Sequence, residues 1–261
     1  DSGVITVVGT ATFVTDVNDV DIVLGSSNAI TGAVTFITQT SGVNGADITF
    51  NNGSTAINLA AFTTEGNLTL ETTQAIDLAG HTVNGNLSVT AGGDITDSGA
   101  LTITGASTFT AANAQSITLD NANTFAGAVS FASAGTLANV MINDSGAFDL
   151  AALTLTGNLS VTAGGAVTDS GALSVAGTTT VSASGQDVTF DNAANDLTGA
   201  VSVNGANVTL VNTNTIDLGA STVSGDYMVT AGGAVTQSGA LSVTGITMIS
   251  AVGQDVTLAN A

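Results

Sequence analysis

The sequence predicts an all-β fold: a right-handed parallel β-helix of roughly eleven to thirteen coils that runs as one continuous solenoid over residues 1–261. Three observations lead to this prediction. The composition is dominated by small and β-branched residues, apolar residues stand at alternate positions, and the same pattern recurs at a fixed distance. The first two observations favour short strands over helices, and the third indicates a stack of coils.

The composition also limits the partners of the chain. Twenty Asp and Glu residues stand without any Lys or Arg, which gives a formal net charge of −20. Nucleic acid is excluded as a partner, because phosphate binding depends on basic side chains. The absence of Cys excludes disulfides and thiolate metal sites. No apolar run approaches the ~18 residues of a membrane-spanning helix, so membrane insertion is not expected.

Apolar residues alternate with polar ones in short runs along the chain, as at Val20, Ile22 and Leu24. The same alternation is found at Val34/Phe36, Ile48/Phe50, Ile57/Leu59, Leu68/Leu70, Ile76/Leu78 and Leu87/Val89. A period of two is that of a strand with one buried face. Four pairs between such runs are expected to supply positive φ angles in turns: Asn44-Gly45, Asn52-Gly53, Asn84-Gly85 and Asn204-Gly205.

The spacing of these runs distinguishes a solenoid from an antiparallel sandwich. The run at Ile57 and Leu59 returns nineteen residues later at Ile76 and Leu78. A sandwich does not require a strand pattern to return after a fixed circuit, whereas each coil of a solenoid must place its strand on the equivalent strand below. We therefore expect strands nineteen residues apart to be neighbours.

A longer repeat is superimposed on this period. The segment GNLSVTAGGAVTDSGALSV, residues 157–175, has near copies at residues 85–103 and 225–243. The copies divide the chain near residues 85–156, 157–224 and 225–261, and each is expected to span about three coils. The paired glycines Gly92-Gly93, Gly164-Gly165 and Gly232-Gly233 are expected at corners, because no Lys and no strand-loop-helix pattern of a phosphate-binding loop follows them.

With these copies the sequence resembles the β-strand repeat regions of large secreted bacterial exoproteins, the filamentous-haemagglutinin-like adhesins of two-partner secretion. The resemblance covers essentially the whole chain. It implies a long parallel β-helical shaft that projects from the bacterial cell surface. The Asn-Pro motifs of the secretion domain in that family have no counterpart here, because the chain contains no proline.

One acidic segment is a candidate calcium site. Asp16, Asn18, Asp19 and Asp21 carry the hard oxygen atoms that Ca²⁺ prefers. If Val20 and Ile22 point inward, Asp19 and Asp21 share the outward face. Two interpretations stay open, a calcium site and a solvated acidic face, and calcium is the only cofactor that the sequence suggests.

Two sets of aspartates recur in the long repeat. Asp94 and Asp97 could bracket an ion, but the other copies have Ala166 with Asp169 and Ala234 with Gln237. Asp77, Asp149 and Asp217 keep their place in three copies, and the preceding coil has Asn58 there. We therefore expect a hydrogen-bonded polar ladder or a solubilising row rather than catalysis at the second set.

His81 is the only histidine and aligns with Leu153 and Ser221 in the other copies. It is expected at a variable surface or turn position. A Ser-His-Asp triad would need this residue as its base, and a histidine that does not recur is a weak candidate. The sequence therefore predicts no catalytic, cofactor-binding or metal-binding residue.

Three classes of function are weighed on these observations. The first is a structural or adhesive extracellular shaft, secreted or on the bacterial cell surface, that self-associates into fibres or contacts a host or neighbouring cell and takes no small-molecule substrate. The second is an enzyme acting on polysaccharide, which the absence of Trp, Lys and Arg disfavours. The third is ice binding through outward threonines. The T-x-T triplets at Thr102-Ile103-Thr104, Thr108-Phe109-Thr110 and Thr154-Leu155-Thr156 do not recur at one fixed offset, so no continuous array is expected.

Overall fold

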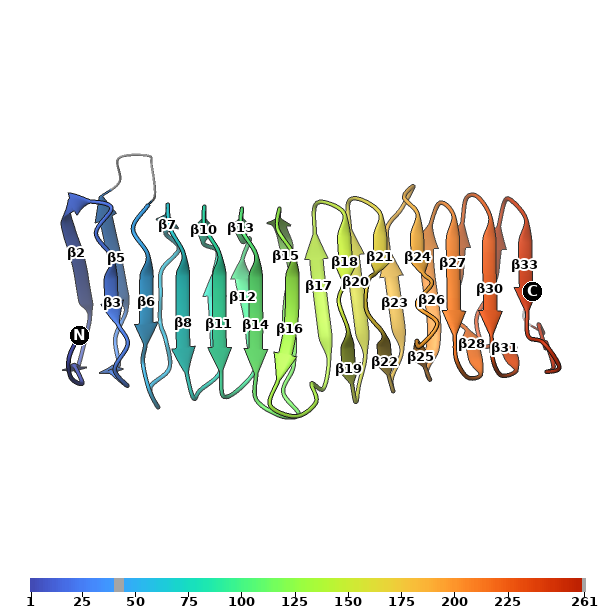
Figure 1. Cartoon of the computed structure of the whole chain (residues 1–261), viewed down its shortest axis with the longest axis horizontal. Helices are drawn as coiled ribbons and strands as arrows, with labels where there is room; N and C mark the ends of the chain where they lie inside the picture. The colour runs from blue at the N-terminus through green and yellow to red at the C-terminus, as the bar shows by residue number, and fades with distance from the viewer. Residues whose placement is uncertain (40–44, 260–261) are drawn as a thin grey trace. The chain divides into compact units, whose positions relative to one another are not determined.

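The computed structural model describes residues 1–39 and 45–259 and contains two compact units, unit 1 (residues 1–135) and unit 2 (residues 136–261). All regular elements of the described residues are β-strands, stacked in parallel as a β-solenoid of about 12 turns (Figure 1). The predicted fold class is therefore confirmed. The right-handed sense of the coil and the single solenoid over residues 1–261 stay predictions.

Unit 1 builds its coils from parallel sheets in which consecutive members are hydrogen-bonded neighbours. The longest contains β3 (Ile22–Leu24), β6 (Ile48–Asn51), β8 (Leu68–Thr72), β11 (Leu87–Ala91), β14 (Ser107–Ala111) and β16 (Val129–Ser133). The other faces contain β1 (Thr6–Val7) with β4 (Ala29–Ile30), β2 (Ala11–Asn18) with β5 (Val34–Gln39), β9 (Ile76–Ala79) with β12 (Ile95–Gly99), and β7 (Thr63–Thr64) with β10 (Thr82–Val83) and β13 (Thr102–Ile103). The long strand β15 (Ile117–Phe125) pairs with β12 and β13.

Unit 2 repeats this arrangement. One sheet contains β18 (Phe148–Leu150), β21 (Val167–Asp169), β24 (Val188–Phe190), β27 (Val208–Asn212), β30 (Tyr227–Ala231) and β33 (Thr247–Ser250). A second contains β17 (Val140–Asp144), β20 (Leu159–Ala163), β23 (Thr179–Ser182), β26 (Ala200–Gly205), β28 (Ile216–Leu218), β29 (Ser221–Val223), β31 (Val235–Gln237) and β32 (Leu241–Val243). A third contains β19 (Leu153–Leu155), β22 (Leu173–Val175) and β25 (Asp196–Leu197).

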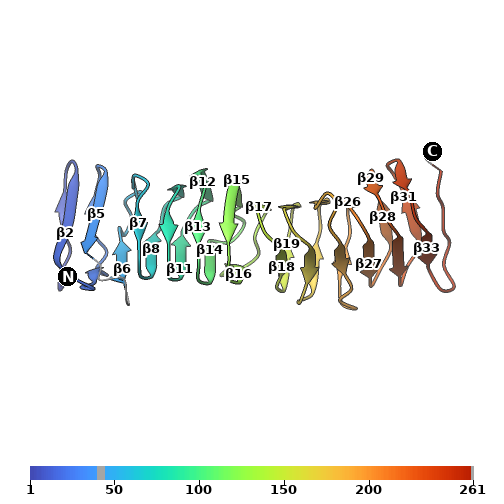
Figure 2. The ribbon, with the colours of Figure 1, turned by 90° about the horizontal axis from the view of Figure 1, so that it is seen from above.

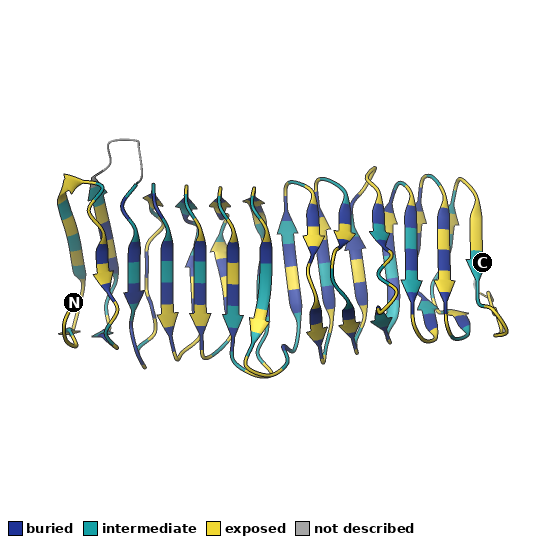
Figure 3. Cartoon of the chain, in the orientation of Figure 1, coloured by how far each residue is buried: buried dark blue, intermediate teal, exposed yellow. Residues whose placement is uncertain are grey.

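The core of each unit is the narrow interior enclosed by these sheets. Buried and more exposed residues alternate along most strands, as the bands of Figure 3 show. Phe50 and Phe109 in unit 1 and Phe190 in unit 2 are completely buried. Burial of each large aliphatic or aromatic side chain contributes roughly 1.5–3 kcal/mol, so stability accumulates coil by coil.

The register confirms the nineteen-residue period. Ile57 forms a parallel bridge with Ile76, and Leu68 pairs with Leu87 (Figure 2 shows β8 and β11 from above). Coil length is not constant, however, because Ser88 pairs with Thr108 twenty residues on and Thr108 pairs with Ser130 twenty-two residues on. The extra residues are accommodated between the strands, so the strand register survives the change in length.

The paired glycines form corners, as predicted. A Cβ atom on Gly92 would lie 2.1 Å from the carbonyl oxygen of Thr73 in the preceding coil, so only glycine fits there. The prediction for the Asn-Gly pairs is partly wrong. Gly53 has a φ of +55°, but Gly45, Gly85 and Gly205 are not in the left-handed region, and Asn44 lies outside the described residues. Gly85 instead allows close approach, because a Cβ there would lie 2.6 Å from the carbonyl carbon of Gly66.

The long repeat is out of phase with the coil. In unit 2 its copies begin with β20 and β30, which lie in different sheets: β20 pairs with β17 and β23, whereas β30 pairs with β27 and β33. After Leu159 in β20, the chain comes back to the sheet of β20 three times, in β23, β26 and β29, near residues 179, 201 and 221. The next copy of the repeat begins only after this, at Tyr227 in β30, which belongs to a different sheet. One repeat is therefore three coils plus one further strand, rather than about three coils.

Candidate functional site

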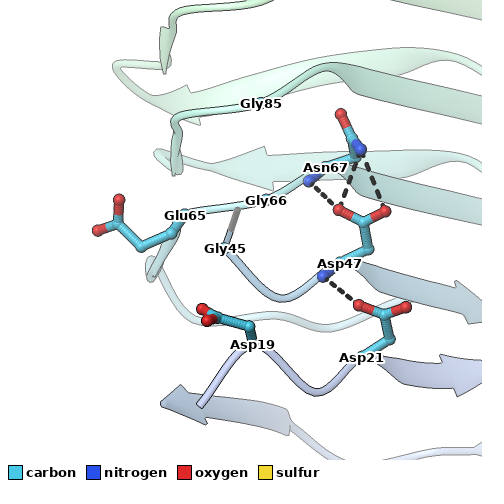
Figure 4. Close-up of a pocket in the computed structure, with 8 residues that line it drawn as sticks. All are labelled: Asp19, Asp21, Gly45, Asp47, Glu65, Gly66, Asn67 and Gly85. Atoms are coloured by element: carbon cyan, nitrogen blue, oxygen red, sulfur yellow. Dashed lines mark hydrogen bonds between the residues drawn. The ribbon is translucent and has the colours of Figure 1, made fainter. Parts of the chain in front are cut away.

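An open acidic groove of about 470 Å³ lies on unit 1 (Figure 4). It is lined by Asp19, Asp21, Gly45, Asp47, Glu65, Gly66, Asn67 and Gly85. The groove gathers carboxylates from successive coils and includes two of the four residues of the predicted calcium segment. Asp16 and Asn18 are exposed and do not line it.

The carboxylates of the groove already accept hydrogen bonds from the protein. Asp21 Oδ1 accepts from the backbone N–H of Asp47 at 2.9 Å, and Asp47 Oδ1 accepts from the backbone N–H of Asn67 at 2.7 Å. The side-chain amide of Asn67 donates to both carboxylate oxygens of Asp47 at 3.0 and 3.1 Å. Glu65 points away from Asp47 and accepts from Asn84 Nδ2 at 2.6 Å (Figure 4). The groove therefore joins coils through its carboxylates.

The expectation that Val20 points inward is wrong. Val20 is 43% exposed, and Asp19 before it has a φ of +59°. This left-handed residue interrupts the alternation after β2, so burial resumes only at Ile22. Among the described residues, no group of three or more His, Asp or Glu side chains could hold a metal ion.

The bonds at the groove belong to a row that we call the corner ladder. In each step the side-chain oxygen of an Asp or Asn accepts the backbone N–H of the equivalent residue one coil later. In unit 1 the acceptors are Asp21, Asp47, Asn67 and Asn86, at 2.7–2.9 Å. In unit 2 they are Asn139, Asn158, Asp187, Asn207 and Asp226, at 2.8–3.1 Å. The recurrence of Asn after Gly in the repeat is explained by this ladder.

A second row follows the outward aspartates. Asp77 accepts from the hydroxyls of Thr96 and Ser98, at 3.3 and 2.6 Å, one coil later. Asp149 accepts in the same way from Thr168 and Ser170, and Asp217 accepts from Thr236 at 3.2 Å. The predicted hydrogen-bonded polar ladder is confirmed at these three residues.

Asp97 and Asp169 are buried, contrary to the idea of an ion bracketed by Asp94 and Asp97. In each unit the aspartate binds a fully buried asparagine, with Asn123 Nδ2 to Asp97 Oδ2 at 2.8 Å and Asn195 Nδ2 to Asp169 Oδ2 at 2.6 Å. Asn123 Oδ1 also accepts from the backbone N–H of Leu101 at 2.7 Å. We call each pair an Asp–Asn bridge. It holds two coils together from the inside.

Burial and hydrogen bonding act in opposite directions on these carboxyl groups. Burial raises the pKa of Asp97 and of Asp169 above the ordinary value, and the hydrogen bonds from Asn123 and Asn195 lower it in part. Asp94 remains exposed and accepts from the backbone N–H of Ser116 at 2.8 Å. The two residues therefore face opposite sides of the wall and cannot bracket one ion.

His81 is also buried, so its predicted surface position is wrong. Only 1% of the residue is exposed, and its ring lies 4.6 Å from that of Phe62. Neither ring nitrogen has a hydrogen-bond partner in the structure. Burial lowers the pKa of His81 to about 4, although the charge of Asp77 raises it in part. A neutral ring in the core cannot act as a surface base.

The period of two could have identified these buried polar residues. Asp97 stands two residues after buried Ile95, and His81 stands two residues before buried Val83. The alternation thus places both on the inner face. The residue types at these positions change from copy to copy, and such variation is typical of surface positions, although the side chains point inward.

Outward hydroxyl groups form one continuous column on unit 1, whereas the T-x-T triplets themselves do not form a single array, as expected. On the longest sheet of unit 1 the first column contains Thr49, Thr69, Ser88, Thr108 and Ser130. The second contains Asn51, Glu71, Thr90, Thr110 and Ala132. We call these ten residues the hydroxyl face. Of the three T-x-T triplets, only Thr108-Phe109-Thr110 lies on this face, because Thr102-Ile103 belongs to β13 and Thr154-Leu155 to β19. The column is instead made of residues that the strand register aligns although coil lengths differ.

The repeats and the parallel coils define a β-solenoid repeat protein. Segments 65–132, 137–204 and 205–261 match the family described as repeats of unknown function (DUF5649), and the chain belongs to this family. Two of these segments are 68 residues long, close to the predicted period, although they begin at other positions in the repeat. No curated protein and no solved structure gives a significant match. No helix among the described residues is long and apolar enough to cross a membrane.

Proposed function

We propose that this chain is part of a structural, adhesive shaft of a secreted or surface-exposed bacterial repeat protein, and that it is not an enzyme. The observation that carries this proposal is the use of the polar side chains. The corner ladder, the outward aspartates and the Asp–Asn bridges all join one coil to the next. These bonds rigidify the stack and give the carboxylates that take part in them a structural use.

The resemblance to two-partner-secretion adhesins supports an extracellular location for such a shaft. The absence of cysteine is compatible with this, because many secreted repeat proteins lack disulfides. The partners in this proposal are further copies of the shaft or the surface of a host or neighbouring cell. Nucleic acid, membrane insertion, a small-molecule substrate and a resident cofactor have no part in it.

Immunogold electron microscopy of the bacterium that makes the protein tests this proposal. Antibodies against the 261-residue chain should label filaments or the outer cell surface, and protease treatment of intact cells should remove the label. Label confined to the cytoplasm would contradict the proposal. Release of reducing ends from a panel of glycans by the purified chain would instead favour an enzyme.

Assembly of shafts should depend on ionic strength. The charge of −20 makes copies repel one another, and salt screens this repulsion over ~8 Å at physiological ionic strength. Light scattering of the purified chain should therefore rise with added NaCl or CaCl₂. Identical scattering in both titrations and in low salt would remove self-association from the proposal. A larger effect of CaCl₂ at matched ionic strength would indicate specific calcium binding.

A further inference from the structure

We propose that the hydroxyl face of unit 1 binds ice. This inference does not rest on the structural role above. It rests on the register that places a hydroxyl-bearing side chain of each of five adjacent strands, β6, β8, β11, β14 and β16, in one column. Beside this column Thr90 and Thr110 of β11 and β14 add a second pair of hydroxyl groups. Seven of the ten positions are Thr or Ser.

The geometry of the face is that of a two-dimensional lattice. Neighbouring strands lie ~4.8 Å apart and residues i and i+2 of one strand lie roughly 6.6 Å apart. The oxygen atoms of hexagonal ice repeat at similar spacings on some of its crystal planes. A ligand without a regular surface would not bind more tightly because of such periodicity, whereas the surface of a crystal can match the spacing over the whole face.

The side chains of the face are preorganised for this contact. Threonine is β-branched and restricted at χ1, so it loses little entropy on binding. The hydroxyl of Ser130 donates to that of Thr108 at 3.2 Å, which links two neighbours of the first column. Each threonine presents a methyl group, around which water is ordered, and a hydroxyl group, which bonds that water to the protein.

The charge distribution favours a neutral ligand. Glu71 is the only acidic residue of the ten, although the chain carries twenty Asp and Glu residues. A second copy of the chain would bring another charge of −20, without any Lys or Arg to offset it. Ice is uncharged, so its binding involves no such electrostatic repulsion. A glycan surface is disfavoured because the face has no aromatic side chain on which a sugar ring could stack.

The six-stranded sheet of unit 2 lacks such a continuous hydroxyl column. There the outward column reads Asp149, Thr168, Thr189, Thr209, Met228 and Met248. The charge at one end and the exposed methionines at the other interrupt the hydroxyls. Thr168 therefore provides a matched control, since it is an exposed strand threonine outside the hydroxyl face.

The test is thermal hysteresis and inhibition of ice recrystallisation by the purified 261-residue chain at micromolar concentration. The parent should show both, and T108Y and T90Y should lose most of the activity because a bulky ring breaks the flat array. T168Y should keep it. Tyrosine suits exposed strand positions, and unchanged thermal unfolding of each variant would show that the fold is retained.

Three results would overturn the proposal. The first is a parent chain without hysteresis or recrystallisation inhibition. The second is a T108Y variant that folds and remains as active as the parent, or a T168Y variant that loses activity equally. The third is T108Y-sensitive binding to crystalline cellulose, or T108Y-sensitive dimerisation in analytical ultracentrifugation, with no effect on ice.

Discussion

Units 1 and 2 place different residues at the same inward position of the repeat. Unit 2 has Leu153 and Ser221 there, both buried, and the Ser221 hydroxyl is hydrogen-bonded to backbone groups, whereas unit 1 has His81, a buried ring with two unpartnered nitrogens. In contrast, both units keep the Asp–Asn bridge with nearly the same bonds. The Asp–Asn bridges thus bury their polar groups as a closed hydrogen-bonded pair, whereas His81 is buried as a neutral ring without a hydrogen-bond partner.

The comparison suggests that the bridges stabilise both units and that His81 weakens unit 1 in acid. The effect of each substitution is measured as the change in the free energy of unfolding in urea. Separate transitions of the two units, if they occur, would assign each effect to its unit.

Removal of the bridge asparagine should have the largest effect. N123A in unit 1 and N195A in unit 2 each leave a buried carboxylate without its main donor, which should cost about 3 kcal/mol at neutral pH. Because the bonds are equivalent, the two losses should be similar. N84A is the control, since Asn84 is exposed and its amide donates to Glu65 at the surface, so its loss should be small. Losses below that of the control in both units would mean that the bridges are not structural.

The acid sensitivity of unit 1 should depend on His81. The folded pKa of about 4 lies below the ordinary value of 6.5, so the unfolded chain takes up this proton first. Stability should therefore fall as the pH decreases from about 6.5 to about 4, by roughly 3 kcal/mol in all. H81L should abolish this loss and should also be more stable than the parent at pH 7, because it leaves no unpartnered nitrogen in the core.

The difference between parent and H81L at each pH isolates the histidine. Asp97 and Asp169, whose pKa values are raised by burial, act with the opposite sign, because protonation at low pH favours the folded state. L153H is the reciprocal variant and should make unit 2 acid-sensitive. Parallel pH profiles of the parent and H81L would contradict the assignment.

The corner ladder should contribute less per residue. N86A in unit 1 and N158A in unit 2 each remove the acceptor of one backbone N–H, so each should lower stability by about 1 kcal/mol. N86D and N158D keep the accepting oxygen and should lose less than the alanine variants. Equal losses for Ala and Asp would show that the side-chain oxygen is not what matters.

The outward aspartates should matter least. D77N and D149N leave an oxygen that can accept from the hydroxyls one coil later, at an exposed position, so each change should lie within about 0.5 kcal/mol. D77N has an additional readout, because Asp77 raises the pKa of His81. The acid-dependent loss of stability of D77N should therefore continue to lower pH and become larger than that of the parent, whereas that of D149N should not change.

Much of the fold could be predicted from local sequence patterns. The alternation at Ile57 and Ile76 gave the strands and the nineteen-residue neighbour relation, and Gly92 gave a corner. These features depend on side-chain period and on backbone contact, which the sequence expresses directly. The aligned threonines could not be found in this way, because extra residues between β14 and β16 change the sequence spacing without changing the strand register.

The polar interior was harder to predict for a different reason. An aspartate such as Asp97 is acceptable inside only because Asn123, 26 residues later, faces it across one coil. That distance does not equal the nineteen-residue period, so no repeat comparison pairs the two residues. The ring nitrogens of His81 have no hydrogen-bond partner, and only the alternation with Val83 indicates that the residue is buried.

The phase difference between repeat and coil has a consequence for folding. Since a copy comprises three coils and one more strand, β20 and β30 of unit 2 share most of their sequence but never pair with each other. Each instead adds to a strand of different sequence, such as β17 or β27. Repeat proteins are prone to exchange equivalent segments, and a chain whose copies face different neighbours makes such an exchange costly. Duplication could therefore lengthen this protein without multiplying the ways in which it misfolds.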